Sequence, residues 1–213
     1  MIFIIDDDIE LGHSLQFLFE TQGIPSLYFS EAPSFLKHLD DFFSNENPER
    51  NMKSSVCLLD LRLGQTNGLD LLEKLKNDYK DLYFPVAMIS GHGDIEIAVE
   101  SMKMGAFDYV TKPIETEKLN ALIERGFSLS KTMIERIRSD KEIQVTLSKL
   151  TKKETQIMKM IATGNSNKSI SDQLGNSIRT VELHRSRILQ KLQVNNAAEI
   201  ATLFERYQNV SQK

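Results

Sequence analysis

The sequence is poor in cysteine and has no long apolar run. Its single cysteine, Cys57, lies in an apolar stretch, so the chain cannot form an internal disulfide or, by itself, a thiolate metal cluster. We expect this side chain to serve in packing. The longest uncharged apolar runs, such as Met1–Ile5 and Val56–Leu59, are much shorter than the roughly 18–20 residues that span a bilayer. No membrane-spanning segment is therefore predicted.

The first residues also lack the pattern of a secretory signal. Asp6, Asp7 and Asp8 directly follow five apolar residues, and there is neither a basic start nor a small-residue cleavage site. We therefore expect a cytoplasmic protein without a membrane partner.

The overall composition is that of a folded protein. Hydrophobic residues make up 40% of the chain and charged residues 26%, which is too apolar for wholesale disorder. At 213 residues the chain is longer than the usual domain of roughly 100–150 residues. Two compact units are expected, and one larger domain is the alternative.

The net charge of −4 is divided unevenly along the chain. Residues 1–125 carry 22 Asp/Glu against 11 Lys/Arg, a net charge of −11, and residues 126–213 carry 8 against 15, a net charge of +7. The first part repels polyanions and the second attracts them, which favours an acidic domain joined to a nucleic-acid-binding domain. The alternative is two solvated surfaces of opposite sign.

The first 125 residues alternate short apolar runs with amphipathic segments. Runs of strand length occur at Ile2–Ile5, Ser26–Phe29, Val56–Leu59, Val86–Ile89 and Phe107–Val110. Apolar residues at helical spacing lie between them. This pattern predicts an α/β fold, a doubly wound five-stranded parallel sheet with helices on both faces. Sites in such sheets lie at the carboxyl ends of the strands.

The rest of the chain is predicted to be all helix. A fifth helix begins near Glu117 and continues as a linker. Thr151 and Glu154 have the spacing of a capping box. A short helix at Asn167–Leu174, a turn at Gly175 and a longer helix capped by Ser177 form a helix-turn-helix pattern. The predicted boundaries are residues 1–125, a helical linker at 126–146, and a helix-turn-helix domain at 147–213.

Five polar residues are predicted to meet at one edge of the sheet. Asp6 and Asp7 follow the first strand, Asp60 and Ser90 end the third and fourth, and Lys112 follows the fifth. Clustered carboxylates raise one another's pKa, and Mg2+ is a cation that such a group can hold. A carboxylate beside Mg2+ can act as a nucleophile toward a phosphoryl group. A lysine and a hydroxyl can then neutralise and hydrogen-bond the added oxygens.

Each of these residues has a purely structural alternative. Aspartates after a strand often cap the following helix. Lys112-Pro113 can end a strand before a turn, and Ser90 can begin a loop. The joint arrangement favours a site over these separate roles.

The stretches IFIIDDD, VCLLDLRLGQTNGLDLLEKL and PVAMISGHGDIEIAVESMKMGAFDYVTKPI resemble the receiver domain of two-component response regulators, a flavodoxin-like fold. The resemblance covers about residues 1–125. It implies that Asp60 is the phosphoacceptor. It also implies that Asp7, Asp60 and the Arg62 carbonyl ligate Mg2+ directly, with Asp6 acting through water.

The same resemblance assigns the residues that respond to the phosphoryl group. Ser90 would bind it, Lys112 would pair with it, and Tyr109 would be the aromatic switch. The Lys112-Pro113 bond is expected to be cis, as is common in the family.

This sequence departs from the receiver pattern in two places. Leu63-Gly64 stands where the family usually has Met-Pro, so a looser loop is expected there. The interval from Asp7 to Asp60 is longer than usual, and the polar loop at residues 44–55 absorbs the surplus. We also predict that Arg62 and His92 flank the phosphoryl group and influence the access of water to it. The alternative for His92 is an exposed loop histidine.

The segment RTVELHRSRILQK places four basic residues on one helix, Arg179, Arg185, Arg187 and Lys191, against the single acid Glu182. Such a helix can enter the major groove of DNA, neutralise phosphates and reach base edges. The alternative is a solvated positive face.

The stretch LTKKETQIMKMIATGNSNKSISDQLGNSIRTVELHRSRILQKLQVNNAAEIATL resembles the LuxR-type helix-turn-helix of the NarL/FixJ class, over about residues 147–207 and closest to the FixJ branch. The resemblance implies a recognition helix at Ile178–Leu192. Its groove-facing residues would be Thr180, Glu182, Leu183, Ser186 and Arg187. Its phosphate-facing residues would be Lys168, Arg179, Arg185 and Lys191. Glu182 stands where other branches have lysine, so it would accept from cytosine or exclude unwanted sequences.

Together these features predict a DNA-binding transcriptional response regulator rather than an enzyme. A sensor histidine kinase would phosphorylate Asp60, and the chain would then form a homodimer on double-stranded promoter DNA, with RNA polymerase as a further candidate partner. Slow self-dephosphorylation is compatible with this prediction.

Two functions from other classes stay open at the level of the sequence. One is a phosphohydrolase, because haloacid-dehalogenase-type enzymes also use a nucleophilic aspartate with Mg2+ and lysine. Their first strand ends in Asp-x-Asp-x-Thr or Val, and the segment Asp6–Glu10 does not match at the fifth position. The other is an interaction module that binds its partner without phosphorylation.

Overall fold

The computed structural model describes residues 1–91 and 93–211. The chain divides into two compact units, Met1–Ile137 and Arg138–Lys213, and each is described by itself. Within the described residues, no helix combines the length and the apolar character that a membrane crossing needs.

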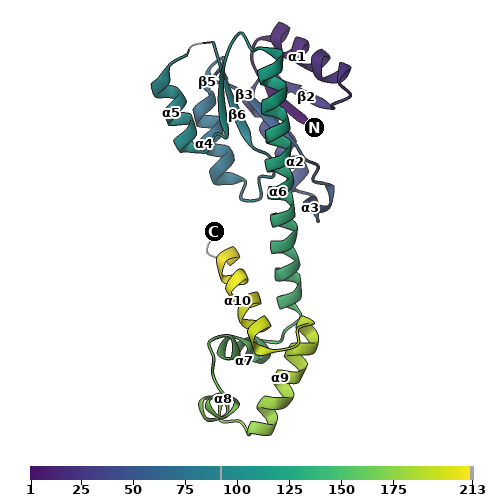
Figure 1. Ribbon diagram of the computed structural model, residues 1–213, viewed down its shortest axis with the longest axis vertical. Helices are drawn as coiled ribbons and strands as arrows, with labels where there is room; N and C mark the ends of the chain where they lie inside the picture. The colour runs from purple at the N-terminus through teal and green to yellow at the C-terminus, as the bar shows by residue number, and fades with distance from the viewer. Residues whose placement is uncertain (92, 212–213) are drawn as a thin grey trace. The chain divides into compact units, whose positions relative to one another are not determined.

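A parallel sheet of five strands in the order β2-β1-β3-β6-β7 forms the centre of the first unit. Its strands are β1 (Ile2–Ile5), β2 (Ser26–Phe29), β3 (Val56–Asp60), β6 (Val86–Ser90) and β7 (Asp108–Thr111) (Figure 1). Each runs along an apolar segment, and β1, β3 and β6 are buried on both faces, as parallel strands between helices are. The predicted doubly wound α/β fold is confirmed.

Helices cover both faces of this sheet. Three helices cover one face, α2 (Ala32–Phe43), α4 (Gly68–Asp78) and α5 (Ile95–Met104), and two cover the other, α1 (Ile9–Thr21) and α6 (Thr116–Ser148) (Figure 1). Alternation along the strands divides the core, because Phe3 packs on the first side and Ile4 on the second. Cys57 is fully buried on the first side, in the packing role expected for it. The segment before β3, expected as a loop, contains the short helix α3 (Pro48–Asn51).

The chain after β3 forms a small hairpin instead of the looser loop that Leu63-Gly64 suggested. The strands β4 (Arg62–Leu63) and β5 (Thr66–Asn67) pair antiparallel. Gly64 adopts φ 61° at the turn, a conformation that glycine adopts without steric cost. Asn67 then caps α4 by accepting a hydrogen bond from the Leu69 amide at 3.0 Å. Both ends of the segment are thus fixed.

The helix α6 is longer than the sheet that it covers, and part of the predicted linker at 126–146 packs on the first unit. Ser130 is fully buried; its hydroxyl donates to the Tyr83 carbonyl at 2.6 Å and accepts from the Ser55 amide at 2.9 Å. Further along α6, Ile134 belongs to the core of this unit. The helix continues without a break past Ile137, where the first unit ends.

The second unit is all helical in its described residues. After the end of α6 come α7 (Lys152–Ala162), α8 (Asn167–Leu174), α9 (Ile178–Leu192) and α10 (Ala197–Ser211). Thr151 and Glu154 form the predicted capping box, and Ser177 caps α9. Gly175 ends α8 with φ 62°. The core consists of Leu150, Ile157, Met158, Ile161, Ile170, Val181, Ile188, Leu192 and Ile200. The helices α8 and α9 form the predicted helix-turn-helix.

Candidate functional site

An acidic cluster lies at the carboxyl ends of β1 and β3. One carboxylate oxygen from each of Asp6, Asp7 and Asp60 lies within 4.8 Å of the other two. Asp6 is 1% exposed and Asp60 is 4% exposed, whereas Asp7 is exposed. Oxygens at this spacing suit a hard divalent cation, which needs several oxygen ligands around one point. Asp7 and Asp60, which lie 53 positions apart in the sequence, are therefore brought together.

Lys112 completes this cluster from the end of β7. Its ammonium lies 2.7 Å from Asp6 Oδ2 and 2.6 Å from Asp60 Oδ1. The Lys112-Pro113 bond is cis, as expected. The Lys112 amide donates to the Ser90 carbonyl at 2.7 Å, so the ends of β6 and β7 are joined beside the acidic cluster.

Backbone amides fix the three carboxylates. The Arg62 amide donates to Asp60 Oδ2 at 2.6 Å, the Gly64 amide to Asp7 Oδ2 at 3.0 Å, and the Asp8 amide to Asp6 Oδ1 at 3.0 Å. The donors at positions 62 and 64 come from the β4-β5 hairpin. Sequence reasoning missed the Gly64 contact, because strands of two residues leave no periodic pattern to read.

The capping alternative for the aspartates holds for one of them. Asp8 Oδ1 accepts hydrogen bonds from the Glu10 and Leu11 amides, both at 3.1 Å, and so caps α1. The carboxylates of Asp6 and Asp7 instead turn toward Asp60.

Burial and ion pairing oppose each other in the cluster. Burial raises the pKa of Asp6, although hydrogen bonds from Lys112 and the Asp8 amide act in the opposite direction. Burial alone would lower the pKa of Lys112, but its hydrogen bonds to Asp6 and Asp60 outweigh that effect and raise it. Lys112 therefore stays charged at neutral pH. Three carboxylates with one ammonium leave negative charge for which a cation is the natural complement.

The remaining predicted residues of the first unit lie around the cluster. Ser90 is buried at the end of β6. Tyr109 is half-buried on β7, packed against the core side that carries α4 and α5. His92 lies outside the described residues.

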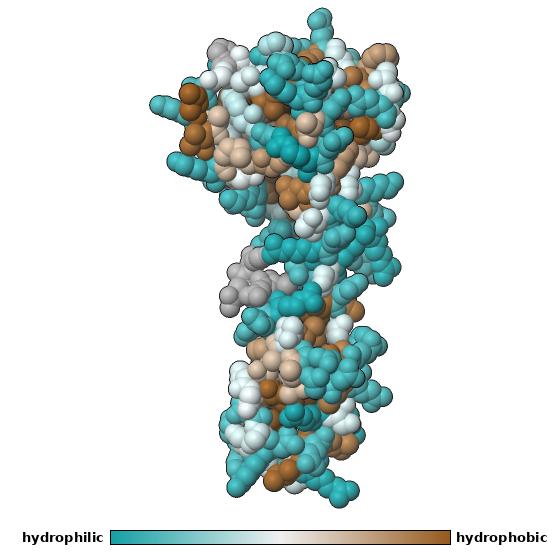
Figure 2. All heavy atoms as spheres, viewed as in Figure 1, coloured by the Kyte–Doolittle hydropathy of each residue, from teal (hydrophilic) through white to brown (hydrophobic). Residues whose placement is uncertain are grey.

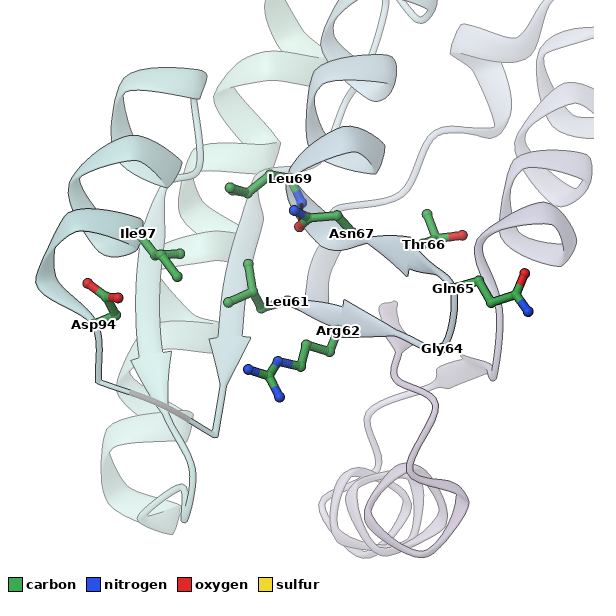
Figure 3. Close-up of a pocket in the computed structure, with 9 residues that line it drawn as sticks. All are labelled: Leu61, Arg62, Gly64, Gln65, Thr66, Asn67, Leu69, Asp94 and Ile97. Carbon is green, nitrogen blue, oxygen red and sulfur yellow. Dashed lines mark hydrogen bonds between the residues drawn. The ribbon is translucent and has the colours of Figure 1, made fainter.

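The Arg62 side chain is exposed and projects from β4 into a pocket between the hairpin and the start of α5 (Figure 3). Asp94, which caps α5, stands across this pocket. The other lining residues are Leu61, Gly64, Gln65, Thr66, Asn67, Leu69 and Ile97.

The helix α9 presents most of the predicted DNA-facing residues to solvent. Leu183 is 51% exposed although it is apolar. The exposed polar residues of the predicted set are Lys168 on α8 and Arg179, Glu182, Ser186 and Arg187 on α9.

Three predicted DNA contacts are bonded within the unit. Arg185 Nη1 donates to Asn167 Oδ1 at 3.1 Å, which joins α9 to the start of α8. The Thr180 hydroxyl lies 2.8 Å from that of Ser177. Lys191 is the clearest case, because its ammonium lies 2.6 Å from Glu154 Oε2.

Glu154 is 3% exposed, and the hydrogen bond from Lys191, followed by that from the Thr151 amide, lowers its pKa to about 2. This link between α7 and α9 was not predicted, because nothing in the sequence pairs residues on two separate helices. The assignment of Lys191 to DNA phosphates stays a prediction.

Comparisons with known proteins match both units. Residues 2–124 match the response regulator receiver domain, and residues 148–204 match the luxR family of bacterial regulatory proteins. The chain is 31% identical to the transcriptional regulatory protein FixJ of Bradyrhizobium diazoefficiens, over 96% of this chain and 94% of that protein. It is 30% identical to the tetrathionate response regulatory protein TtrR of Salmonella typhimurium, over 96% and 92%.

Solved structures agree with these matches. The response regulator StyR aligns with a TM-score of 0.75 and 30% identity, over 97% of this chain and 98% of that chain. Full-length FixJ from B. japonicum aligns with a TM-score of 0.54 and 30% identity, over 98% and 97%.

Proposed function

Because this chain belongs to the response regulators of the NarL/FixJ class, with a receiver domain followed by a LuxR-type DNA-binding domain, we propose that it is a transcriptional regulator switched by phosphorylation of Asp60. The domains in this proposal are residues 1–125 and 147–213, joined by the helix at 126–146. A sensor histidine kinase is the proposed phosphoryl donor, and the proposed location is the cytoplasm.

The geometry around Asp60 supports this role. Asp60 lies beside two further carboxylates and the Lys112 ammonium. An Asp60 oxygen forms a bond to phosphorus while the bond from phosphorus to the donor breaks, which gives an acyl phosphate. Lys112 is then placed to pair with the new phosphoryl oxygens, and Ser90, at the adjoining strand end, to donate its hydroxyl proton to one of them.

The proposed cofactor is Mg2+, held by Asp7, Asp60 and the Arg62 carbonyl, with Asp6 acting through water. The fit rests on the chemistry and spacing of the donors, which are oxygens within 4.8 Å of one another at Asp6, Asp7 and Asp60. When bound, Mg2+ neutralises charge on the phosphoryl oxygens during transfer.

Phosphorylation is proposed to act through an existing two-state equilibrium of β7 and its flanking helices. In this proposal Ser90 and Lys112 move toward the phosphoryl group and Tyr109 turns inward. The same face is the proposed surface for homodimerisation. Its helix α5 exposes apolar side chains, with Ile95 78%, Val99 47% and Met102 48% exposed (Figure 2, upper left), and such patches are typical of interaction surfaces.

The proposed DNA target is double-stranded promoter DNA, with α9 in the major groove. Exposed Leu183 and Arg187 are suited to base edges, and Arg179 and Lys168 to phosphates. RNA polymerase is a proposed partner at the promoter. Two basic domains held together in a dimer would combine two modest affinities.

The acidic cluster with Lys112 is the observation that carries the proposal, and Mg2+-dependent labelling tests it. The wild-type chain should form an acid-stable, hydroxylamine-sensitive phosphoryl adduct when incubated with a small phosphodonor and Mg2+. Asp60→Asn should form none. Asp41→Asn, which removes an exposed carboxylate on α2, should be labelled like the wild type. A genome-wide binding assay then identifies the promoters.

The other outcomes of this experiment separate the two rival functions. Steady turnover of a phosphate ester, with release of phosphate, would support a phosphohydrolase. DNA binding by a chain that is never labelled would support an interaction module that works without phosphorylation.

A further inference from the structure

A half-buried tyrosine on β2 reaches the acidic cluster. The Tyr28 hydroxyl donates to the backbone carbonyl of Asp6 at 2.9 Å. The neighbouring Phe29 carbonyl accepts from the Asp6 amide at 3.1 Å. The strand β2 therefore holds the backbone of Asp6 on both sides. The carbonyl bonded to Tyr28 belongs to the peptide that joins Asp6 to Asp7, so its orientation determines where the Asp7 side chain starts.

The Tyr28 ring occupies a space that only a glycine leaves open. Gly12 lies within α1, and a Cβ atom at this position would be 2.3 Å from Tyr28 Cε2 and 2.6 Å from Cζ. Glycine is an unfavourable residue inside a helix, yet α1 has one directly beneath this ring. The ring also contacts His13, the next residue of α1, edge to face, with ring centroids 5.5 Å apart. The position of the phenol is thus fixed by its surroundings.

We propose that Tyr28 is a positioning residue for the metal site, because its hydroxyl fixes the peptide between Asp6 and Asp7. Asp7 is exposed, and its carboxylate is held by the Gly64 amide at 3.0 Å. A second constraint, on the peptide that carries Asp7, presets the direction of this ligand before a cation arrives. Residues that orient metal ligands in this way raise the affinity for the metal. The inference rests on the proposed function, since it needs Asp6 and Asp7 to hold Mg2+.

The test compares two tyrosines in the full chain. Tyr28→Phe removes the hydroxyl and keeps the ring. Tyr79→Phe is the matched control, because the Tyr79 hydroxyl bonds to Asp40 and Leu36 instead. Titration calorimetry with Mg2+ alone should give a dissociation constant about three- to tenfold higher for Tyr28→Phe than for the wild type, as expected for one lost hydrogen bond. Tyr79→Phe should match the wild type.

Acyl-phosphate formation supplies a second readout. Labelling of Tyr28→Phe should be slower than that of the wild type at low Mg2+ and should recover at saturating Mg2+. Recovery shows that the variant is folded and that Asp60 is competent, so a loss confined to low Mg2+ reports on the metal site.

A third variant disturbs the hydrogen bond from Tyr28 to Asp6 by moving the ring instead of removing the hydroxyl. Gly12→Ala keeps the hydroxyl but displaces the ring, and it should weaken Mg2+ binding in the same way. The double variant Gly12→Ala/Tyr28→Phe should bind Mg2+ as Tyr28→Phe does, because the same bond is already lost.

Two results would overturn the inference, and they differ. If the wild type binds Mg2+ and Tyr28→Phe binds it equally well, the positioning role is wrong while the proposed function stands. If the wild type neither binds Mg2+ nor is labelled at Asp60, the proposed function fails and this inference fails with it.

Discussion

Lys112 sets the electrostatic balance of the acidic cluster at the scale of single residues. Its ammonium contacts both Asp6 and Asp60, the two buried carboxylates. Leaving two buried carboxylates without a cationic partner would be costly, so Lys112 stabilises the folded cluster by pairing with both. Asp7, the third carboxylate, is exposed.

The Arg62 side chain is predicted to slow hydrolysis of the acyl phosphate. Its amide holds Asp60, but its side chain projects over the neighbouring pocket (Figure 3). Arg62→Ala keeps the amide and opens the site to water, so the acyl phosphate should decay faster, by about threefold or more. The decay of the labelled chain after removal of the phosphodonor measures this rate. Gln65→Ala, in the same hairpin, is the control. An equal lifetime in wild type and Arg62→Ala would contradict the water-access role.

The sequence predicted this site because its residues follow apolar runs, and the ends of parallel strands must meet. It did not predict the contacts that orient the residues. The bond from Tyr28 to Asp6 and the space above Gly12 depend on how β2 packs against α1, and no spacing in the chain records that packing. In the same way, Lys191 was grouped with the DNA-facing residues by its charge, since its partner Glu154 lies on another helix.

Among the elements, the placement of α9 depends on polar contacts as well as on apolar packing. Lys191, near the end of α9, pairs with Glu154 in the capping box that begins α7. Arg185, in its middle, bonds to Asn167 at the start of α8. The helix α9 is thus tied to two other helices, while Ser186, Arg187 and Gln190, which lie between the two ties, remain exposed.

The Glu154–Lys191 pair predicts a pH dependence. The pKa of Glu154 is about 2 in the folded chain, against an ordinary value of 4.5. Because the folded value is the lower one, the stabilisation is present above about pH 4.5 and is lost as the pH falls toward 2. Glu154→Gln should lower the free energy of unfolding of the second unit at pH 7 by about 1–3 kcal/mol. The difference from the wild type should shrink below pH 4.5.

Denaturant titrations followed by circular dichroism at several pH values measure this effect. Glu182→Gln, which changes an exposed carboxylate on α9, should leave the stability almost unchanged. A wild-type and Glu154→Gln difference that stays constant from pH 7 to pH 2 would argue against the pair.

The exposed face of α9 predicts a salt dependence. Arg179→Ala and Arg187→Ala each remove an exposed positive charge. If each contacts one phosphate, the slope of log affinity against log salt concentration should fall by about 0.9 per substitution. Binding to a DNA duplex, followed by fluorescence anisotropy at several salt concentrations, gives the slope. Lys37→Ala, which removes an exposed positive charge on α2, is the control. Unchanged slopes for both arginine variants would place the DNA elsewhere.

At the scale of the whole molecule, the uneven charge limits how phosphorylation can act. Residues 1–125 carry a net charge of −11 and residues 126–213 carry +7. Phosphorylation of Asp60 would replace a singly charged carboxylate by an acyl phosphate with about two negative charges. It would therefore add about one negative charge to the acidic part and cannot raise the affinity for DNA by attraction. In the proposed mechanism, the gain in affinity comes from bringing two basic domains together in the dimer.

Asp60→Ala tests this at the level of the complete chain. Under phosphorylating conditions the variant should stay less dimeric than the wild type in sedimentation experiments. Its affinity for promoter DNA should be at least about tenfold lower, because the benefit of two linked contacts is lost. Asp41→Ala should behave like the wild type. Equal dimerisation and equal DNA binding by Asp60→Ala and wild type would exclude this mechanism.

Cys57 allows the unfolding of the first unit to be followed separately from that of the second. It is the single thiol of the chain, and it is fully buried on β3. Burial also raises the pKa of this thiol. A maleimide or disulfide reagent therefore finds no accessible thiolate while the sheet is folded. The rate of alkylation therefore reports how often the sheet opens, and it is insensitive to unfolding of the second, helical unit. A cation that binds only the folded first unit should slow that alkylation in proportion to its occupancy. The reactivity of Cys57 would then measure how much of the neighbouring acidic cluster is occupied.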